Sequence, residues 1–385
     1  MEFDVIIVGG GLVGASLAAS LKSSGLSLAL VEGQTAAFSH AGWDSRIYAI
    51  TPGNVEFLKE CGSWQRQDMS RVQPVEAMRV FGDDDSELEF SAYEIGAPEL
   101  TFILENRLMQ EALWETILDQ DNLTLFNPAR CAALDLGLDA ATLTLEDGRE
   151  LRAKLVVGAD GRDSWVRKQA GMDEAPTPYQ QHGVVANFRC EKPHRGVAYQ
   201  WFSPDSILAY LPLPQQMMSM VWSVLPEKSA ELLKLSPEDL CAQVAAAGHH
   251  TLGELELVTP PSSFALRILR LPHIVKPRLA LVGDAAHNVH PLAGQGVNLG
   301  FRDARELAQT LLARGPQRDC GDYALLRRYD RARQEDIFSM LTTTDALKKL
   351  FCNADPLLRK VRNLGLSATN HLTPAKRMLA RHALI

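Results

Sequence analysis

The chain has 385 residues, of which 46% are hydrophobic and 22% charged, and its formal net charge is −8 at pH 7. This composition is typical of a soluble globular protein with room for more than one domain. The negative net charge argues against general nucleic-acid binding. The six cysteines show no CxxC or metal-ligand spacing, so they indicate buried thiols in a reducing compartment and not a disulfide framework.

The first residues and the hydropathy predict a cytoplasmic protein. Glu2 and Asp4 are acidic where a signal peptide would be basic, and no apolar run approaches the roughly 20 residues that a membrane span needs. Residues 356–385 combine six Lys or Arg with several leucines and contain no Asp or Glu. Two interpretations of this segment stay open: a helical pair packed on the body or on an oligomer partner, or an amphipathic element on anionic lipid at the inner face of the membrane.

An apolar strand near the start runs into glycines and then a helix. Residues 5–8 predict a parallel strand covered on both faces. Gly9, Gly11 and Gly14 follow as GxGxxG. The first glycine allows a tight turn, the second lets the main chain approach a pyrophosphate, and the third allows close helix packing. The helix, to about residue 24, would direct its N-terminal amides at that phosphate, so the turn predicts a dinucleotide site.

A second predicted strand, residues 26–31, ends at Glu32, which lies 18 residues beyond Gly14. A carboxylate at this position accepts hydrogen bonds from a ribose 2′-hydroxyl and repels a 2′-phosphate. The stretch therefore suits FAD or NAD and disfavours NADP.

Two later stretches each place Gly and Asp after an apolar strand and before a helix. In residues 155–171, LVVGADGRDSWVRKQAG, the strand runs into Asp160, and a helix begins near residue 164. In residues 278–304, RLALVGDAAHNVHPLAGQGVNLGFRDA, the strand ends at Asp284, and a glycine-rich loop leads into a helix near residue 296.

Together the three stretches resemble the GxGxxG, DG and GD motifs of the single-component FAD-dependent aromatic hydroxylases. Within that group the chain is most similar to the hydroxylases of ubiquinone biosynthesis. The similarity covers most of the chain and includes WDSRIYAIT (43–51), ENRLMQEAL (105–113), GDYALLRRYDRARQED (321–336) and LTPAKRMLA (372–380). The resemblance implies an α/β, glutathione-reductase-like (Rossmann-type) FAD-binding fold with an antiparallel-sheet substrate domain and a helical C-terminal segment.

We expect a discontinuous FAD-binding domain that comprises residues 1–75, 99–180 and 268–330. Residues 182–226 read as successive β-strands with short turns, and they would belong to a substrate domain of residues 76–98 and 181–267 that covers the flavin. A helix is predicted around 228–248, a strand near 264–269, and a helical segment over 331–385.

The resemblance also implies which residues bind FAD. Asp284 would hold the ribityl or pyrophosphate part, and Arg46 and Arg107 the phosphates and the ribityl region. Asp160 would serve the pyrophosphate side and NAD(P)H docking, a role compatible with capping a helix, and the main chain at Cys131 would pass the adenine. The full expected set is Gly9, Gly11, Leu12, Val13, Gly14, Glu32, Arg46, Arg107, Cys131, Asp160, Asp284, Pro291, Gly294, Gln295, Gly296, Val297 and Asn298.

The implied activity is that of an NAD(P)H:oxygen aromatic-ring monooxygenase. NADPH or NADH would dock transiently and reduce bound FAD, O₂ would be the co-substrate, and a flavin C4a-hydroperoxide would hydroxylate the ring of a polyprenylated phenol. No activating base is identified, because Tyr199, Tyr210 and His182 are better explained as structural residues of the predicted sheet.

Other interpretations also stay open. The scaffold suits another flavin-dependent enzyme, an isoprenoid reductase or a halogenase, and a non-catalytic flavin-binding subunit among other quinone-biosynthesis proteins. His287 and His290 have HxxH spacing, but no third ligand clusters near them in the sequence, so no metal is predicted.

Overall fold

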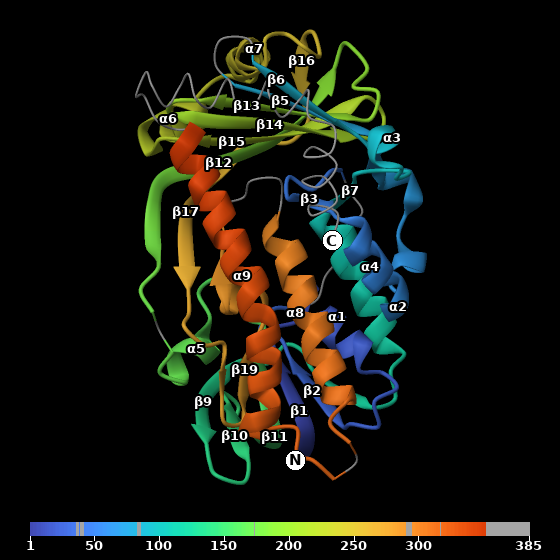
Figure 1. Ribbon diagram of the computed structural model, residues 1–385, viewed down its shortest axis with the longest axis vertical. Coiled ribbons are helices and arrows are strands. Elements are labelled where there is room, and N and C mark those ends of the chain that lie inside the picture. Colours follow the sequence, from blue (N-terminus) through green and yellow to red (C-terminus); the bar gives the residue numbers. More distant parts are fainter. Residues whose placement is uncertain are drawn as a thin grey trace.

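The computed structural model of the chain describes residues 1–35, 38, 42–82, 86–172, 174–289, 295–315 and 317–351. Two large sheets lie one above the other in Figure 1, and a short sheet lies between them. We call them the lower, upper and middle sheets. The middle sheet has the order β3-β7-β4 and consists of β3 (Ile47–Ile50), β7 (Thr101–Glu105) and β4 (Gln73–Val75).

The lower sheet has the parallel centre expected of a dinucleotide-binding fold. Its order is β18-β19-β11-β1-β2-β8, and β10 pairs with both β11 and β9. Strand β1 pairs in parallel with β2 and β11. The central strand of a parallel sheet is covered on both faces, which agrees with the full burial of Val5, Ile6 and Ile7. The strands are β18 (Val275–Lys276), β19 (Leu279–Leu281), β11 (Glu150–Gly158), β1 (Glu2–Val8), β2 (Leu28–Val31), β8 (Leu123–Phe126), β10 (Ala141–Leu145) and β9 (Cys131–Leu136).

The helices on the lower sheet pack side by side. Helix α1 contacts both α4 and α8, and α8 contacts α9. A Cβ on Gly300 of α8 would lie 2.6 Å from Val13 Cγ2, so a glycine there permits the close approach of α8 to α1. Helix α1 ends at Ser20, one turn earlier than predicted. The helices are α1 (Leu12–Ser20), α2 (Pro52–Cys61), α4 (Asn106–Leu118), α5 (Trp165–Gln169), α8 (Gln295–Leu312) and α9 (Tyr323–Phe351).

The upper sheet has the order β20-β17-β12-β15-β14-β13-β5-β6, with β16 beside β12. Strands β13, β14 and β15 lie within residues 182–226, where successive strands were predicted. Neighbours are antiparallel as expected, except that β13 and β5 are parallel; these two are far apart in the chain, so no hairpin dictates their direction. The strands are β5 (Ala77–Phe81), β6 (Glu87–Ser91), β12 (Thr177–Cys190), β13 (Val197–Ser203), β14 (Ser206–Leu213), β15 (Met217–Val224), β16 (Leu255–Leu257), β17 (Ser262–Arg270) and β20 (His287–Asn288).

Both faces of the upper sheet are apolar, and they pack on different partners. The outer face contributes Tyr199, Trp201 and Tyr210 to a cluster with residues of two short helices. The inner face, toward the middle sheet, contributes Ala198 and Leu213 to a separate cluster. The division of the chain into domains at the boundaries given above remains our proposal.

The single helix predicted over 228–248 is wrong. The structure has two helices instead, α6 (Pro226–Leu232) and α7 (Pro237–Ala247). Pro237 is favourable in the first turn of a helix and unfavourable in its interior, and the Ser236 side chain accepts a hydrogen bond from Asp239 N to cap the second helix. The short helix α3 (Ala92–Ile95) follows β6.

Helix α9 extends from the lower sheet to the upper sheet (Figure 1). Near its start, the buried hydroxyl of Tyr329 donates to the carbonyl oxygen of Leu281 at 2.9 Å. Near its end, Leu350 packs on an upper-sheet cluster that includes Phe202. The rest of the predicted helical segment, residues 352–385, lies outside the described residues. Over the part of the chain that is described, we find no helix both long and apolar enough to cross a membrane.

Candidate functional site

The turn between β1 and α1 is closed by main-chain contacts. Gly9 has φ of 106°, and a Cβ there would overlap the main chain of Ala159. A Cβ on Gly14 would overlap the carbonyl oxygen of Gly9. Gly11 has no atom within 4 Å of its Cβ position and lines a cavity, so its main chain is open to a ligand. This geometry accounts for all three glycines, and their contact with a dinucleotide remains a proposal.

Glu32 directly follows β2 and forms hydrogen bonds with the same turn. Its Oε2 accepts a hydrogen bond from Gly10 N at 2.7 Å, and its Oε1 accepts one from Gln34 N at 2.8 Å. Trp114 Nε1 donates to the carbonyl oxygen of Gly10 at 2.8 Å. A carboxylate offers about four acceptor positions. Glu32 therefore retains capacity for a ribose hydroxyl.

Cys131 and Asp160 lie near Glu32 at this edge of the lower sheet. Burial raises the pKa of the Cys131 thiol to about 12, and the negative charges of Asp160 and Glu32 act in the same direction. Asp160 accepts hydrogen bonds from the Ser164 hydroxyl at 2.5 Å and from Val166 N at 2.9 Å, so it does hold the start of α5. Burial raises the pKa of Asp160, and these hydrogen bonds oppose that rise.

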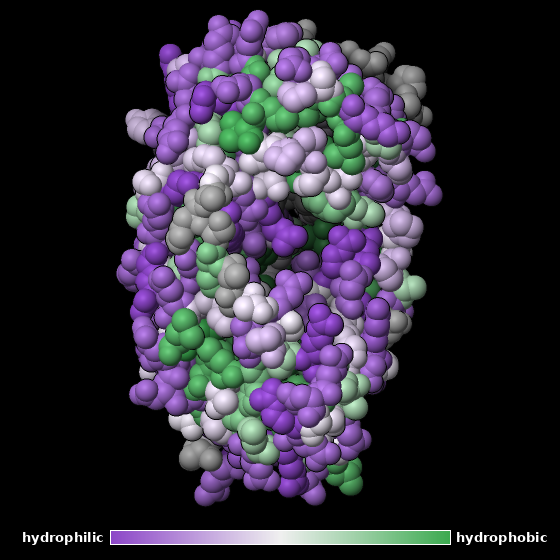
Figure 2. Space-filling view, turned by 180° about the vertical axis from the view of Figure 1, so that it is seen from behind, coloured by the Kyte–Doolittle hydropathy of each residue, from purple (hydrophilic) through white to green (hydrophobic). Residues whose placement is uncertain are grey.

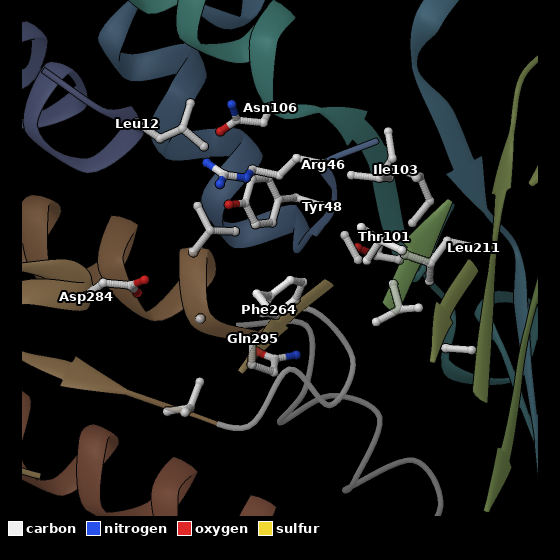
Figure 3. Close-up of a pocket in the computed structure, with 18 of the residues that line it drawn as sticks. Leu12, Arg46, Tyr48, Thr101, Ile103, Asn106, Leu211, Phe264, Asp284 and Gln295 are labelled. Carbon is white, nitrogen blue, oxygen red and sulfur yellow. The ribbon is translucent and has the colours of Figure 1, made fainter. Parts of the chain in front are cut away.

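Asp284 projects into the cavity from a turn of 3₁₀ helix, Gly283–Ala285 (Figure 3). The residue is accessible from the cavity that it lines. Desolvation by the surrounding protein raises the pKa of the Asp284 carboxyl, while the nearby His287, Arg162 and Arg46 oppose that rise. A carboxylate in this position can accept hydrogen bonds from ligand hydroxyl groups.

Asp303 of α8 fixes the loop that carries Asp284. The fully buried carboxylate accepts hydrogen bonds from Gly283 N at 2.9 Å, from His287 Nε2 at 2.6 Å and from Arg333 Nε of α9 at 2.7 Å. Burial acts to raise the pKa of Asp303, but His287 and Arg333 outweigh it and hold the pKa below its ordinary value. His287 is thus a loop anchor.

His290, the second residue of the HxxH pair, lies outside the described residues. Among those that are described, no three His, Cys, Asp or Glu side chains are grouped as metal ligands would be.

The first turn of α8 also faces the cavity. Gln295, Gly296 and Val297 line it. The Asn298 side chain is buried elsewhere: its Nδ2 donates to the carbonyl oxygen of Ala49 at 2.7 Å, and its Oδ1 accepts from Thr51 N at 3.0 Å. Asn298 therefore ties α8 to the end of β3. Pro291 and Gly294 lie outside the described residues.

A buried glutamate at the end of β7 anchors the segment that carries Arg46. Glu105 accepts hydrogen bonds from Asp44 N at 2.7 Å and from Arg71 Nε at 2.8 Å. Arg107 N donates to the Asp44 carboxylate at 3.1 Å. Burial raises the pKa of Glu105, and the Asp44 amide and Arg71 oppose that rise. The Arg46 guanidinium itself lies at the cavity (Figure 3).

A single cavity of about 1030 Å³ joins these features to the upper sheet. Figure 2 shows a hollow at mid-height, with hydrophilic residues around it and hydrophobic residues deeper inside. In Figure 3, Leu12 and Asp284 lie at one end, Tyr48 and Phe264 in the middle, and Leu211 at the other end. The end near Leu12 and Asp284 is polar, and we call it the motif-built end because residues of the GxGxxG and GD motifs form it. The end near Leu211 is mainly apolar.

The two tyrosines and the histidine that were considered as a base differ in their positions relative to the cavity. The Tyr210 hydroxyl donates to the carbonyl oxygen of Val244 on the outer side of the upper sheet, at 2.5 Å. Tyr199 lines the cavity but stacks on Trp201 at 5.7 Å between ring centroids. His182 is not among the lining residues. No base is assigned.

The expected FAD-binding residues thus fall into three groups. Those that line the cavity are Gly11, Leu12, Val13, Arg46, Asp284, Gln295, Gly296 and Val297. A second group does not line the cavity but contacts or neighbours the segments that do. It consists of Gly9, Gly14, Glu32, Arg107, Cys131, Asp160 and Asn298. Pro291 and Gly294 are not described.

Sequence reasoning missed several residues that hold the site together. Glu105 and Arg71 are two of them, and Asp303 is a third. Arg167 is a fourth: it is buried and donates to the carbonyl oxygen of Ala285 at 3.0 Å, which joins the DG and GD motifs. Glu105, Arg167 and Asp303 lie inside quoted motif stretches, which was the available signal.

Comparison with known proteins identifies the family. The family described as the FAD binding domain matches residues 2–343. The chain is 39% identical to the ubiquinone hydroxylase UbiL of Rhodospirillum rubrum, over 99% of this chain and 89% of that protein. It is 36% identical to the 3-demethoxyubiquinol 3-hydroxylase of Escherichia coli, over 99% of this chain and 98% of that protein. The chain belongs to the FAD-dependent ubiquinone-biosynthesis hydroxylases.

Solved structures agree with the fold of this hydroxylase family. The crystal structure of PqsL, a probable FAD-dependent monooxygenase from Pseudomonas aeruginosa, matches with a TM-score of 0.80 over 96% of this chain and all of that one, at 23% identity. The expected family, the α/β FAD-binding fold, the FAD cofactor and the monooxygenase class are confirmed.

The residues present fit FAD. The glycines leave main chain open at the start of α1, and Arg46 supplies a positive charge for phosphate at the cavity wall. Asp284 presents a carboxylate to the same space. A volume of about 1030 Å³ is at the upper end of the range for ligand pockets, about 300–1,000 Å³, as a large cofactor beside a substrate requires.

Proposed function

We propose that this hydroxylase acts on the aromatic ring of a polyprenylated phenol in ubiquinone biosynthesis, with NADPH or NADH as electron donor and O₂ as co-substrate. The observation that carries the proposal is the single cavity, which joins the motif-built polar end to the apolar inner face of the upper sheet. The names of the Rhodospirillum rubrum and Escherichia coli relatives support the substrate class.

We assign FAD to the motif-built end of the cavity. The lining residues named above would contact it, while Asp303, Glu105 and Arg107 act through the segments that they anchor. Bound FAD, reduced by NAD(P)H, supplies the activated oxygen that an aromatic ring does not take from O₂ directly. The assignment of Cys131, Asp160 and the 291–294 loop to this cofactor belongs to the same proposal.

The chain's own contribution is to bind, orient and exclude water. The N-terminal amides of α8 favour negative charge at the first turn, where Gln295, Gly296 and Val297 line the cavity. The apolar side chains at the upper end, among them Leu211 and Val221, favour an apolar ring and keep water from it.

The finer account of partners also belongs here. A prenylated substrate resides in a membrane, and the basic, leucine-containing segment 356–385 would bring the protein to anionic lipid at the inner face. Truncation of this segment should abolish sedimentation with vesicles that contain anionic lipid, and unchanged sedimentation would contradict the lipid contact. Other quinone-biosynthesis proteins are further candidate partners.

The activity is tested with purified protein. The wild type should show a flavin visible spectrum, oxidise NAD(P)H faster when a prenylated phenol is added, and place one atom of ¹⁸O₂ in the aromatic product by mass spectrometry. Gly14→Val, which cannot close the first turn, is the matched variant without FAD. A protein that stays colourless in excess FAD, or a flavoprotein that yields no ring-hydroxylated product, would overturn the proposal.

A further inference from the structure

The four strands β12 to β15 of the upper sheet form a largely apolar part of the cavity wall, and this part includes one buried amide side chain. The strands contribute mostly aliphatic side chains to this wall. The amide is that of Gln200 of β13. Its partners in the adjacent strands are Ala209 of β14 and Val80 of β5, which offer it no side-chain hydrogen bond.

Alternation along β13 directs Gln200 inward. Tyr199 and Trp201 belong to the outer cluster, whereas Ala198 belongs to the inner one. Because successive side chains of a strand point to opposite faces, Gln200 points the same way as Ala198, toward the cavity that both residues line.

The Gln200 amide has no protein partner within the described part of the chain. The residue is only 5% exposed, and no residue that the structure describes hydrogen-bonds its side chain. By contrast, the hydroxyl of Thr101, which also lines the cavity, donates to the carbonyl oxygen of Ile50 at 2.7 Å. An amide has two donors and an acceptor, and those of Gln200 are accessible from the cavity that the residue lines. The arrangement therefore provides hydrogen-bonding capacity for a ligand.

We propose that the Gln200 amide hydrogen-bonds the phenolic hydroxyl of the substrate's aromatic head group and so selects its orientation. This inference rests on the proposed function. An apolar wall binds a ring without fixing its rotation, because the hydrophobic effect is non-directional. One amide in that wall accepts from the hydroxyl, fixes which edge of the ring faces the motif-built end of the cavity, and thereby makes Gln200 a specificity-determining residue.

The test compares two ligands on three proteins. The ligands are 2-prenylphenol and its methyl ether, which keeps the ring and the prenyl group but cannot donate a hydrogen bond. The proteins are the wild type, Gln200→Met, and Tyr210→Phe as a control on the outer face of the same sheet. Dissociation constants are measured by protein and flavin fluorescence on the FAD-loaded proteins, after thermal melting and FAD content have shown that each variant is folded. Gln200→Leu replaces Gln200→Met if the latter does not fold.

We expect the wild type and Tyr210→Phe to prefer the phenol to the ether, and Gln200→Met to lower that preference by about tenfold, with FAD content unchanged. The position of hydroxylation should also become less selective in Gln200→Met. An equal preference in wild type and Gln200→Met would overturn the role of Gln200, even if hydroxylation is normal. A wild type that prefers the phenol but hydroxylates no ring would overturn the proposed function alone, and one that binds neither ligand would overturn both.

Discussion

Replacement of Asp303 by asparagine removes a buried charge at the junction of α8, α9 and the loop that carries Asp284. The carboxylate accepts from Gly283 N, His287 and Arg333 at 2.9, 2.6 and 2.7 Å. The asparagine amide nitrogen would face one of these donors. Loss of one partner of a buried ion pair costs about 3–5 kcal/mol. Because Arg333 keeps Asp336 at 2.6 Å, we expect the lower end, about 3 kcal/mol.

Urea unfolding of the FAD-saturated proteins, followed by circular dichroism, measures this free energy. Glu256→Gln is the control: it removes an exposed carboxylate that pairs with Arg189 at 3.1 Å, and no measurable change is expected. A loss of under about 1 kcal/mol for Asp303→Asn would refute the reasoning, because a hydrogen bond alone contributes that much.

The same variant has a characteristic pH dependence. Burial acts to raise the pKa of Asp303, but His287 and Arg333 outweigh it, so the pKa is lower in the folded than in the unfolded state. The resulting stability is fully present above the unfolded-state value of about 4 and is lost as the pH falls through the folded-state pKa. The difference between wild type and Asp303→Asn should be constant near neutral pH and narrow below about pH 4. An unchanged difference at low pH would contradict the assignment.

Three further variants test the cofactor end of the site. Gly14→Ala places a methyl group against the carbonyl oxygen of Gly9, so its flavin absorbance per protein should fall below about a tenth of wild type, and normal loading would contradict this. Trp114→Phe removes the donor to Gly10 and should weaken FAD binding by about 1 kcal/mol in a fluorescence titration; an unchanged dissociation constant would show that this bond does not shape the turn. Glu105 has a pKa raised by burial, so its contribution to stability should decrease as the pH rises above about 4.3, and Glu105→Gln should lack that decrease in urea unfolding; equal slopes would refute it.

Much of the fold could be predicted from local patterns. Strands β13 and β14 lie within residues 182–226, where short turns between apolar runs predicted successive strands. The break between α6 and α7 could also have been predicted from the sequence. Ser236 and Pro237 are residues typical of an N-cap and of the first turn of a helix, and they indicate that a new helix begins there. The face of each upper-sheet strand was not readable. Both faces are apolar, so the period of the strand shows that the side chains of Tyr199 and Gln200 point in opposite directions without showing which one points toward the middle sheet.

The candidate site was predictable where one turn makes it and unpredictable where distant segments meet. The GxGxxG motif is short, so its glycines and their spacing can be recognised in the sequence itself. The anchors of the site join residues far apart in the chain, such as Asp44 with Glu105 and Thr51 with Asn298. The hydrophobic periodicity of the sequence does not predict which distant residues form such hydrogen bonds. The hydrogen bonds of the Asn298 side chain with Ala49 and Thr51 could therefore not be predicted from the sequence.

The absence of a wall across the cavity, in the part of the chain that the structure describes, has a thermodynamic consequence. Two ligands that occupy one continuous chamber form part of each other's binding surface, so each should change the affinity of the other by the same factor. For this protein, the shape of the shared chamber then determines the free energy of coupling between cofactor and phenol, in addition to the affinity for each ligand.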